Sequence, residues 1–78
     1  MPPTVSPASE SGIQVIDRAV TLLDALATHE TGATLKVLGL DAGLSPSTTF
    51  RILAALHVHG LVQRNEAGHY LLGSRLTR

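Results

Sequence analysis

Apolar residues recur at helical spacing in the first half of the chain. Between Ile13 and Thr28 they are separated mostly by three or four positions, with polar residues in most of the gaps. These apolar positions are Ile16, Ala19, Val20, Leu23, Leu26 and Ala27. Because an α-helix turns about every 3.6 residues, such positions share one face. The pattern predicts an amphipathic helix from Ile13 to about Thr28 that buries this face.

A second, shorter apolar run extends from Leu35 to Ala42. Thr34 precedes it and offers a hydroxyl that can accept a hydrogen bond from the first turn of a helix. Gly43 follows it and suits the left-handed conformation that often ends a helix. We therefore expect a helix of about two turns, which depends on packing because it is short and contains Gly39.

A third helix is predicted from residue 46 to about residue 59. Ser45 is a good N-cap residue, and Pro46 fits the first helical position, where an N–H group has no partner within the helix. Gly60 follows the last apolar residues of this segment and is expected to end the helix.

Two short strand-like runs, residues 61–64 and 69–72, follow the third helix. The connection between them contains Asn65 and Gly68, which favour a tight hairpin. The element order is therefore helix, helix, tight turn, helix and hairpin. We predict a mainly α fold with a small β-hairpin: a winged helix-turn-helix with a three-helix core and a two-stranded wing, over residues 13–73.

The first twelve residues differ from the rest, since they hold three of the four prolines and little that is apolar. Such a segment cannot bury enough surface to offset the entropy lost on ordering. We expect residues 1–12 to form a flexible N-terminal tail.

Composition narrows the range of functions. The chain has 78 residues, enough for one small domain, and no cysteine, which excludes disulfides and thiolate metal sites. It has no apolar run of membrane-spanning length and no signal-peptide pattern, so a cytoplasmic location without membrane contact is expected.

His57 and His59 fall on different faces of the third helix, and no nucleophile or acid–base constellation is present. We expect no metal, no cofactor and no catalysis.

The net charge of zero hides an uneven distribution. Residues 1–44 carry two basic and five acidic side chains, for a net charge of −3, whereas residues 45–78 carry four and one, for a net charge of +3. A local positive field attracts a polyanion whatever the total charge. The asymmetry is compatible with nucleic-acid binding, although a chance scatter of arginines over a solvated surface is the alternative.

The third helix carries the most informative face. One side groups the apolar residues with Thr49, and the other side combines small residues with a single arginine, Arg51. A face of this kind can approach the floor of the major groove of DNA. Ser45, Ser47 and Thr48 add hydroxyls for phosphate oxygens or base edges, and the guanidinium of Arg51 can bind a guanine edge through two hydrogen bonds.

A second interpretation stays open for these residues. The segment starting at Ser45 could be no more than a good helix start, with Arg51 a solvated surface residue.

At the hairpin, Arg64 and Asn65 are candidates for contacts with the phosphate backbone. Glu66 at the tip opposes deep insertion of the wing into a groove, because phosphates repel its carboxylate.

Taken together, four stretches resemble the N-terminal domain of the IclR family of bacterial transcription regulators. The resemblance covers residues 13 to 76, in order and at suitable spacing. Its segments are IDRAVTLLDALA at 16–27, AGLSPSTTFRILAAL at 42–56, HGLVQR at 59–64 and GHYLLG at 68–73.

The resemblance implies a sequence-specific repressor or activator that binds duplex DNA as a homodimer, with helix 46–59 in the major groove of each half of a palindrome-like operator. It also implies a C-terminal domain, absent from this sequence, that binds a small organic effector and to which residues 74–78 begin the linker. Ser47, Thr48 and Arg51 fall where such proteins touch DNA, and Arg64 falls at the wing.

Four positions depart from the family pattern. The family usually has a small residue at Lys36 and polar residues at Val37, Leu40 and Leu71. Val37, Leu40 and Leu71 either form an exposed apolar contact surface, or a rotated second helix buries the first two. The exposed alternative leaves open a different function, that of a winged helix that binds protein and not DNA.

Overall fold

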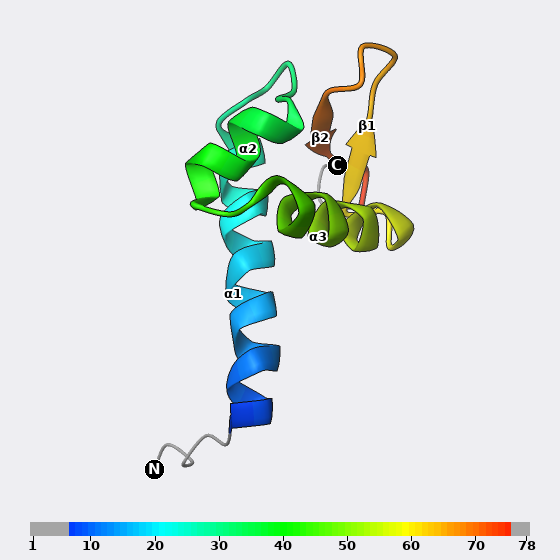
Figure 1. Ribbon diagram of the computed structural model, residues 1–78. Helices are drawn as coiled ribbons and strands as arrows, with labels where there is room; N and C mark the ends of the chain where they lie inside the picture. Colours follow the sequence, from blue (N-terminus) through cyan, green and yellow to red (C-terminus); the bar gives the residue numbers. More distant parts are fainter. Residues whose placement is uncertain (1–6, 76–78) are drawn as a thin grey trace.

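Three helices and a β-hairpin make up the computed structural model (Figure 1), which describes the backbone of residues 7–75 and the side chains of residues 13–75. The elements are α1 (Pro7–Ala27), α2 (Leu35–Ala42), α3 (Pro46–Val58), β1 (Val62–Arg64) and β2 (Tyr70–Leu72). α2, α3 and the hairpin gather around the C-terminal half of the long helix α1 (Figure 1). The predicted winged helix-turn-helix is thereby confirmed.

The first helix begins earlier than the sequence pattern indicated. α1 starts at Pro7 and not at Ile13, so residues 7–12 belong to the helix and not to a tail. Residues 1–6 of the expected tail, and residues 76–78 of the expected linker, lie outside the described residues.

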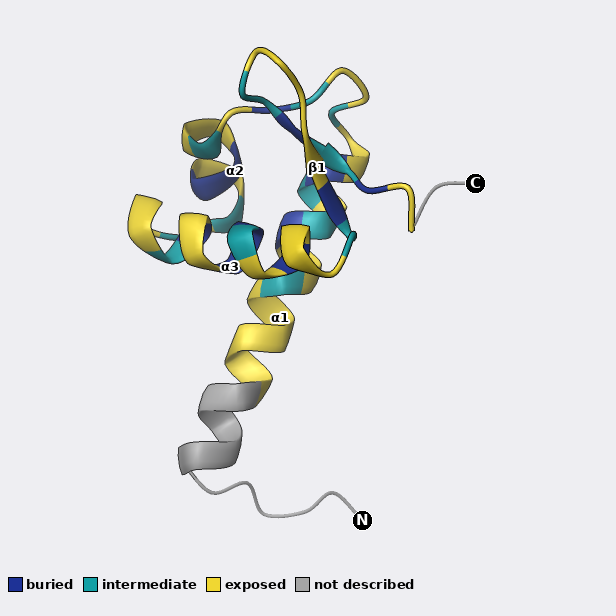
Figure 2. Cartoon of the chain, turned by 90° about the vertical axis from the view of Figure 1, so that its right-hand side faces the viewer, coloured by how far each residue is buried: buried dark blue, intermediate teal, exposed yellow. Residues whose placement is uncertain are grey.

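The buried face of α1 also differs from the predicted one. Leu22 and Leu26 are buried, whereas Ile16 and Val20 are 64% and 49% exposed. The prediction was wrong for Ile16 and Val20 because α2, α3 and the hairpin cover only one side of α1, and mainly toward its C-terminal end (Figure 2). Periodicity identifies an apolar face, but only the packing partners decide how far along the helix it is covered.

Both predicted N-caps are present. The hydroxyl oxygen of Thr34 accepts a hydrogen bond of 3.2 Å from the backbone N–H of Val37 at the start of α2. Ser45 does the same for Thr48 at the start of α3, also at 3.2 Å. Gly43 ends α2 with φ of 68°, the left-handed conformation expected of it. Local sequence therefore sets where these two helices begin and where α2 ends.

Helices α2 and α3 approach closely at Gly39. This residue is buried, and a Cβ atom on it would lie 3.0 Å from Oγ1 of Thr49 and 3.2 Å from the carbonyl oxygen of Leu44. Thr49 is fully buried and donates its hydroxyl to the carbonyl oxygen of Ser45 at 2.8 Å. A glycine inside α2 lets the two helices cross at this short distance and so sets the orientation of α3.

The core lies between the three helices and the hairpin. Its buried apolar residues are Leu22, Leu26, Ala33, Leu38, Ile52, Leu53, Leu56, Val62 and Tyr70. The two strands are antiparallel with Val62 opposite Leu72. Ala33 pairs with Tyr70 through two backbone hydrogen bonds of 3.0 and 2.8 Å, which ties the segment before α2 to the wing. The sequence pattern did not indicate this pairing.

Candidate nucleic-acid interface

Helix α3 presents one buried and one open face. Thr49, Ile52, Leu53 and Leu56 are buried against the rest of the domain. The opposite face carries Ser47 and Arg51, both exposed, together with half-buried Ala54 and exposed Val58. This is the division that the sequence predicted. The exposed face is narrow, shallow and free of acidic side chains, since residues 46–58 contain no Asp or Glu.

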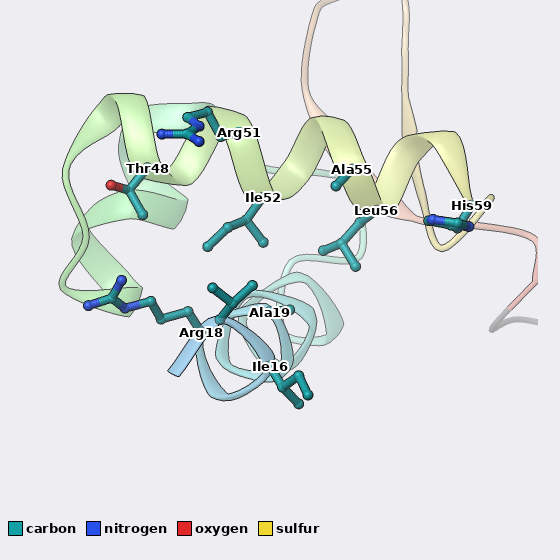
Figure 3. A pocket seen from close by; sticks show the side chains of 10 residues that line it. Ile16, Arg18, Ala19, Thr48, Arg51, Ile52, Ala55, Leu56 and His59 are labelled. Carbon is teal, nitrogen blue, oxygen red and sulfur yellow. The ribbon is translucent and has the colours of Figure 1, made fainter. Parts of the chain in front are cut away.

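Arg51 stands on this face without an internal partner. The structure gives its side chain no hydrogen bond or ion pair with any of the described residues, and its guanidinium lies along the first turns of α3 (Figure 3). An arginine free of internal partners retains all its donors for a ligand. Its planar group fits the two acceptors of a guanine edge or the oxygens of a phosphate.

The three hydroxyl residues at the start of α3 play different parts. The hydroxyl of Ser45 caps the helix and also donates to Oγ1 of Thr48 at 3.0 Å. Its hydrogen-bonding capacity is therefore largely used within the protein. Ser47 is exposed, and its only hydrogen bond among the described residues is a long one, 3.5 Å, to the hydroxyl of Ser45. Ser47 is thus the freer of the two for an external ligand.

The two predicted wing residues are held by contacts within the hairpin. The Nε–H of Arg64 donates to the carbonyl oxygen of Gly68 at 3.3 Å, and its guanidinium carbon lies 5.1 Å from the ring centre of Tyr70. Oδ1 of Asn65 accepts from the backbone N–H of His69 at 3.0 Å and closes the turn. Arg64 remains exposed, and its terminal N–H groups have no hydrogen-bond partner among the described residues. Asn65 has a structural role that the sequence did not indicate.

Sequence reasoning missed Arg18. A hollow of about 470 Å³ lies between α1 and α3, and Arg18 lines it together with Thr48 and Arg51 (Figure 3). In the sequence, Arg18 belonged to the acidic half of the chain. Its place beside the start of α3 follows from the packing of α1 against α3, so no local signal could have found it.

Phe50 was also overlooked. It lies on α3 directly before Arg51 and is 51% exposed. The signal was present, because Phe50 follows Ser47 by three positions and precedes Ala54 by four, which places it on the same side of the helix. The sequence analysis assigned Phe50 to neither face of the helix.

The apolar residues that depart from the family pattern do not form one surface. Leu40 is 73% exposed and Val37 is 38% exposed, so a rotated α2 that buries both is excluded. α2 buries Leu38 and Gly39 instead. Leu71 is half-buried and lines a separate small hollow that includes neither Val37 nor Leu40. Of these three residues, only Val37 and Leu40, both on α2, are exposed.

Two further properties concern the whole of the described part of the chain. Within it, no helix combines the length and the apolar character needed to cross a membrane. Nor do any three His, Asp or Glu side chains among these residues lie close enough to hold a metal ion.

Comparison with known proteins gives one consistent result. Residues 15–66 match the family model of the IclR helix-turn-helix domain. The chain is 46% identical over 68 residues to the HTH-type transcriptional regulator Rv1719 of Mycobacterium tuberculosis, covering 86% of this chain and 26% of the relative. It is 41% identical over 66 residues to the HTH-type transcriptional regulator TtgV of Pseudomonas putida, covering 83% of this chain and 26% of the relative.

The transcriptional repressor IclR of Escherichia coli is 34% identical over 74 residues, covering 92% of this chain and 27% of the relative. A crystal structure of an IclR-family transcriptional regulator from Rhodococcus superimposes with a TM-score of 0.74 at 25% identity, over 94% of this chain and 28% of that one. The chain spans about a quarter of the length of the relatives that it matches.

Proposed function

The chain belongs to the IclR family of helix-turn-helix proteins, and from this premise we propose that it binds duplex DNA sequence-specifically, with α3 in the major groove, as the DNA-binding part of a transcription regulator. The observation that carries the proposal is Arg51: a guanidinium without an internal partner, exposed on a helix face of small residues that has no acidic side chain.

Each side chain has a role in this proposal. Arg51 reads a guanine edge, and Ser47 and Thr48 contact phosphate or base edges near the N-terminus of α3, where the helix dipole favours an anion. Arg64 on the wing and Arg18 on α1 contact the phosphate backbone on either side. Ser45 and Asn65, whose oxygens are engaged within the protein, hold the helix start and the wing in shape.

The proposal extends to the assembly. Two copies would bind the two halves of a palindrome-like operator, and the exposed apolar side chains of α1 support contact with a second copy. They are Ile13, Val15, Ile16 and Val20. We further propose that the intact cytoplasmic regulator takes up a small organic effector through a separate domain, in keeping with the greater length of the relatives, and that it is not an enzyme.

The experiment is selection of duplexes from a random pool by the 78-residue chain at low salt, followed by affinity measurements on the selected sequence. We expect enrichment of a defined half-site and an affinity that falls steeply as salt rises. Arg51→Ala should cost about 1–3 kcal/mol and relax the preference at one base pair. Arg51→Lys is the matched control, because it keeps the positive charge but cannot form the bidentate hydrogen bonds of a guanidinium.

The same experiment has a result that would contradict the proposal. If no sequence is enriched and no salt-sensitive binding occurs even at about 50 mM salt, the proposed DNA contact of α3 is wrong. Leu40 and Val37 on α2 then favour the second candidate, a winged helix that binds another protein. That module should be indifferent to Arg51→Ala and lose its partner on Leu40→Ser.

A further inference from the structure

Phe50 is an aromatic residue that the core does not use. The chain contains one tyrosine and one phenylalanine. Tyr70 is buried in the core, as expected for an aromatic side chain in a small domain, whereas Phe50 is 51% exposed. About half of its surface is exposed, although burying it would stabilise the fold.

The neighbours of Phe50 on α3 are the residues of the proposed DNA interface. Residues three or four positions apart are adjacent on a helix surface, so Phe50 lies next to Ser47 and Ala54, with Arg51 immediately after it in sequence. Ser47 and Arg51 are exposed, and the side chain of Ala54 is too small to separate Phe50 from a flat surface. Phe50 and Arg51 point about 100° apart and border the strip of Ser47 and Ala54 from its two sides, so a ligand lying on this strip can contact both.

The floor of the major groove offers such a side chain one apolar target. Among the four bases only thymine carries a large apolar group there, its C5 methyl, and aromatic side chains are suited to contact it. A protein surface as the target is less consistent with the neighbours, because α3 carries the positive charge of Arg51 and no carboxylate. The position of Phe50 in the first half of α3 is also where recognition helices meet base edges.

We propose that Phe50 reads the methyl group of a thymine next to the base pair contacted by Arg51. This inference rests on the proposed function and adds a second determinant of specificity to it. Arg51 selects by hydrogen bonding, and Phe50 selects by burying a methyl group that cytosine lacks. The half-site should accordingly contain a thymine within one or two base pairs of the guanine read by Arg51.

The test uses deoxyuridine, which pairs as thymidine does and keeps its hydrogen-bonding groups but lacks the methyl. In the selected duplex, each thymine near the Arg51-dependent guanine is replaced by deoxyuridine in turn, and the affinity of the 78-residue chain is measured by fluorescence anisotropy. One replacement should weaken binding roughly three- to fivefold, as expected for one apolar carbon removed from a buried contact.

The variant Phe50→Ala should bind the thymine duplex more weakly and show no further loss with deoxyuridine. Leu40→Ala is the matched control, since Leu40 is an exposed apolar residue on α2, outside the proposed interface, and this variant should keep the full response to deoxyuridine. Phe50→Leu retains an apolar contact and should keep part of the response to deoxyuridine. Because Phe50 is half exposed, its variants should unfold at about the same temperature as the parent protein, which circular dichroism can verify.

Three outcomes would overturn the inference. The first is a selected half-site without a thymine near the Arg51-dependent guanine. The second is specific, salt-sensitive binding whose affinity does not change with any deoxyuridine replacement, or changes by the same factor for the parent chain and for Phe50→Ala. In both of these cases the proposed function survives. The third is the absence of sequence-specific binding, which removes the proposed function as well.

Discussion

Gly39 and Thr49 show how two residues set the position of the helix that carries the interface. Their side-by-side contact fixes the crossing of α2 and α3, since any Cβ on Gly39 would press on a hydroxyl that is itself held by Ser45. A glycine in a helix ordinarily costs about 1 kcal/mol relative to alanine. Here the close packing of the two helices offsets that cost.

We expect Gly39→Ala to destabilise the domain in spite of its better helix propensity. The contact with Thr49 should cost about 1–3 kcal/mol, more than the propensity gains. Urea unfolding monitored by circular dichroism measures the change. The double variant Gly39→Ala/Thr49→Ala should lose less than the sum of its single variants, because removing the hydroxyl relieves the overlap. Additive losses, or a stabilised single variant, would contradict this account of the crossing.

At the scale of single elements, the start of α3 serves both folding and binding. Ser45 caps the helix with its hydroxyl oxygen, and the same first turn presents Ser47 and Thr48 toward the proposed ligand. The sequence predicted both uses for Ser45. The observed hydrogen bonds assign it mainly to the first, because they already involve both its oxygen and its hydroxyl proton.

The variant Ser45→Asp separates these two uses. Aspartate is as good an N-cap as serine and interacts favourably with the helix dipole, so the free energy of unfolding should change by less than about 0.5 kcal/mol. DNA affinity should fall about tenfold or more, because a carboxylate at this turn repels phosphates. Ser45→Asn is the neutral control of similar shape and should retain both properties. Undiminished DNA affinity in Ser45→Asp would show that phosphate does not approach this end of α3.

The wing shows the limit of element prediction. Strand-like runs and the turn residues Asn65 and Gly68 predicted a hairpin, and one is present. The pairing of Ala33 with Tyr70 was not predictable, since a single bridge between distant residues leaves no periodic pattern. It matters for the site because it ties the base of the wing to the segment that leads into α2.

For the molecule as a whole, the largest exposed apolar surface lies along α1. Ile13, Val15, Ile16 and Val20 are exposed on this helix, whose N-terminal part extends away from the other elements (Figure 2). Apolar exposure of this extent on so small a domain supports the proposed contact with a second copy.

We expect the double variant Ile16→Ser/Val20→Ser to leave the fold intact and to weaken self-association. Both side chains are exposed in the single chain, so the stability of the monomer should change by less than about 1 kcal/mol. Sedimentation velocity over a range of concentrations measures the association, and titration of a duplex with two half-sites measures its effect on DNA binding. Leu40→Ser is the control for loss of an exposed apolar residue elsewhere. Equal association of parent and variant would exclude the surface around Ile16 and Val20 as the contact surface.

The sequence by itself determined the order of the elements, the ends of α2, the start of α3 and the chemistry of the exposed face of α3. Each of these depends on residues a few positions apart: the caps at Thr34, Gly43 and Ser45, and the spacing that separates Arg51 from the buried side of its helix. Such local interactions are available before the chain is packed.

Only the tertiary structure decided which apolar residues of α1 are buried, where Arg18 lies, and that Phe50 remains exposed. The physical reason is the same in each case. An apolar side chain is buried only where another element comes to cover it, and Arg18 reaches the start of α3 only because α1 packs against α3. These contacts join residues far apart in sequence, so local spacing carries no record of them.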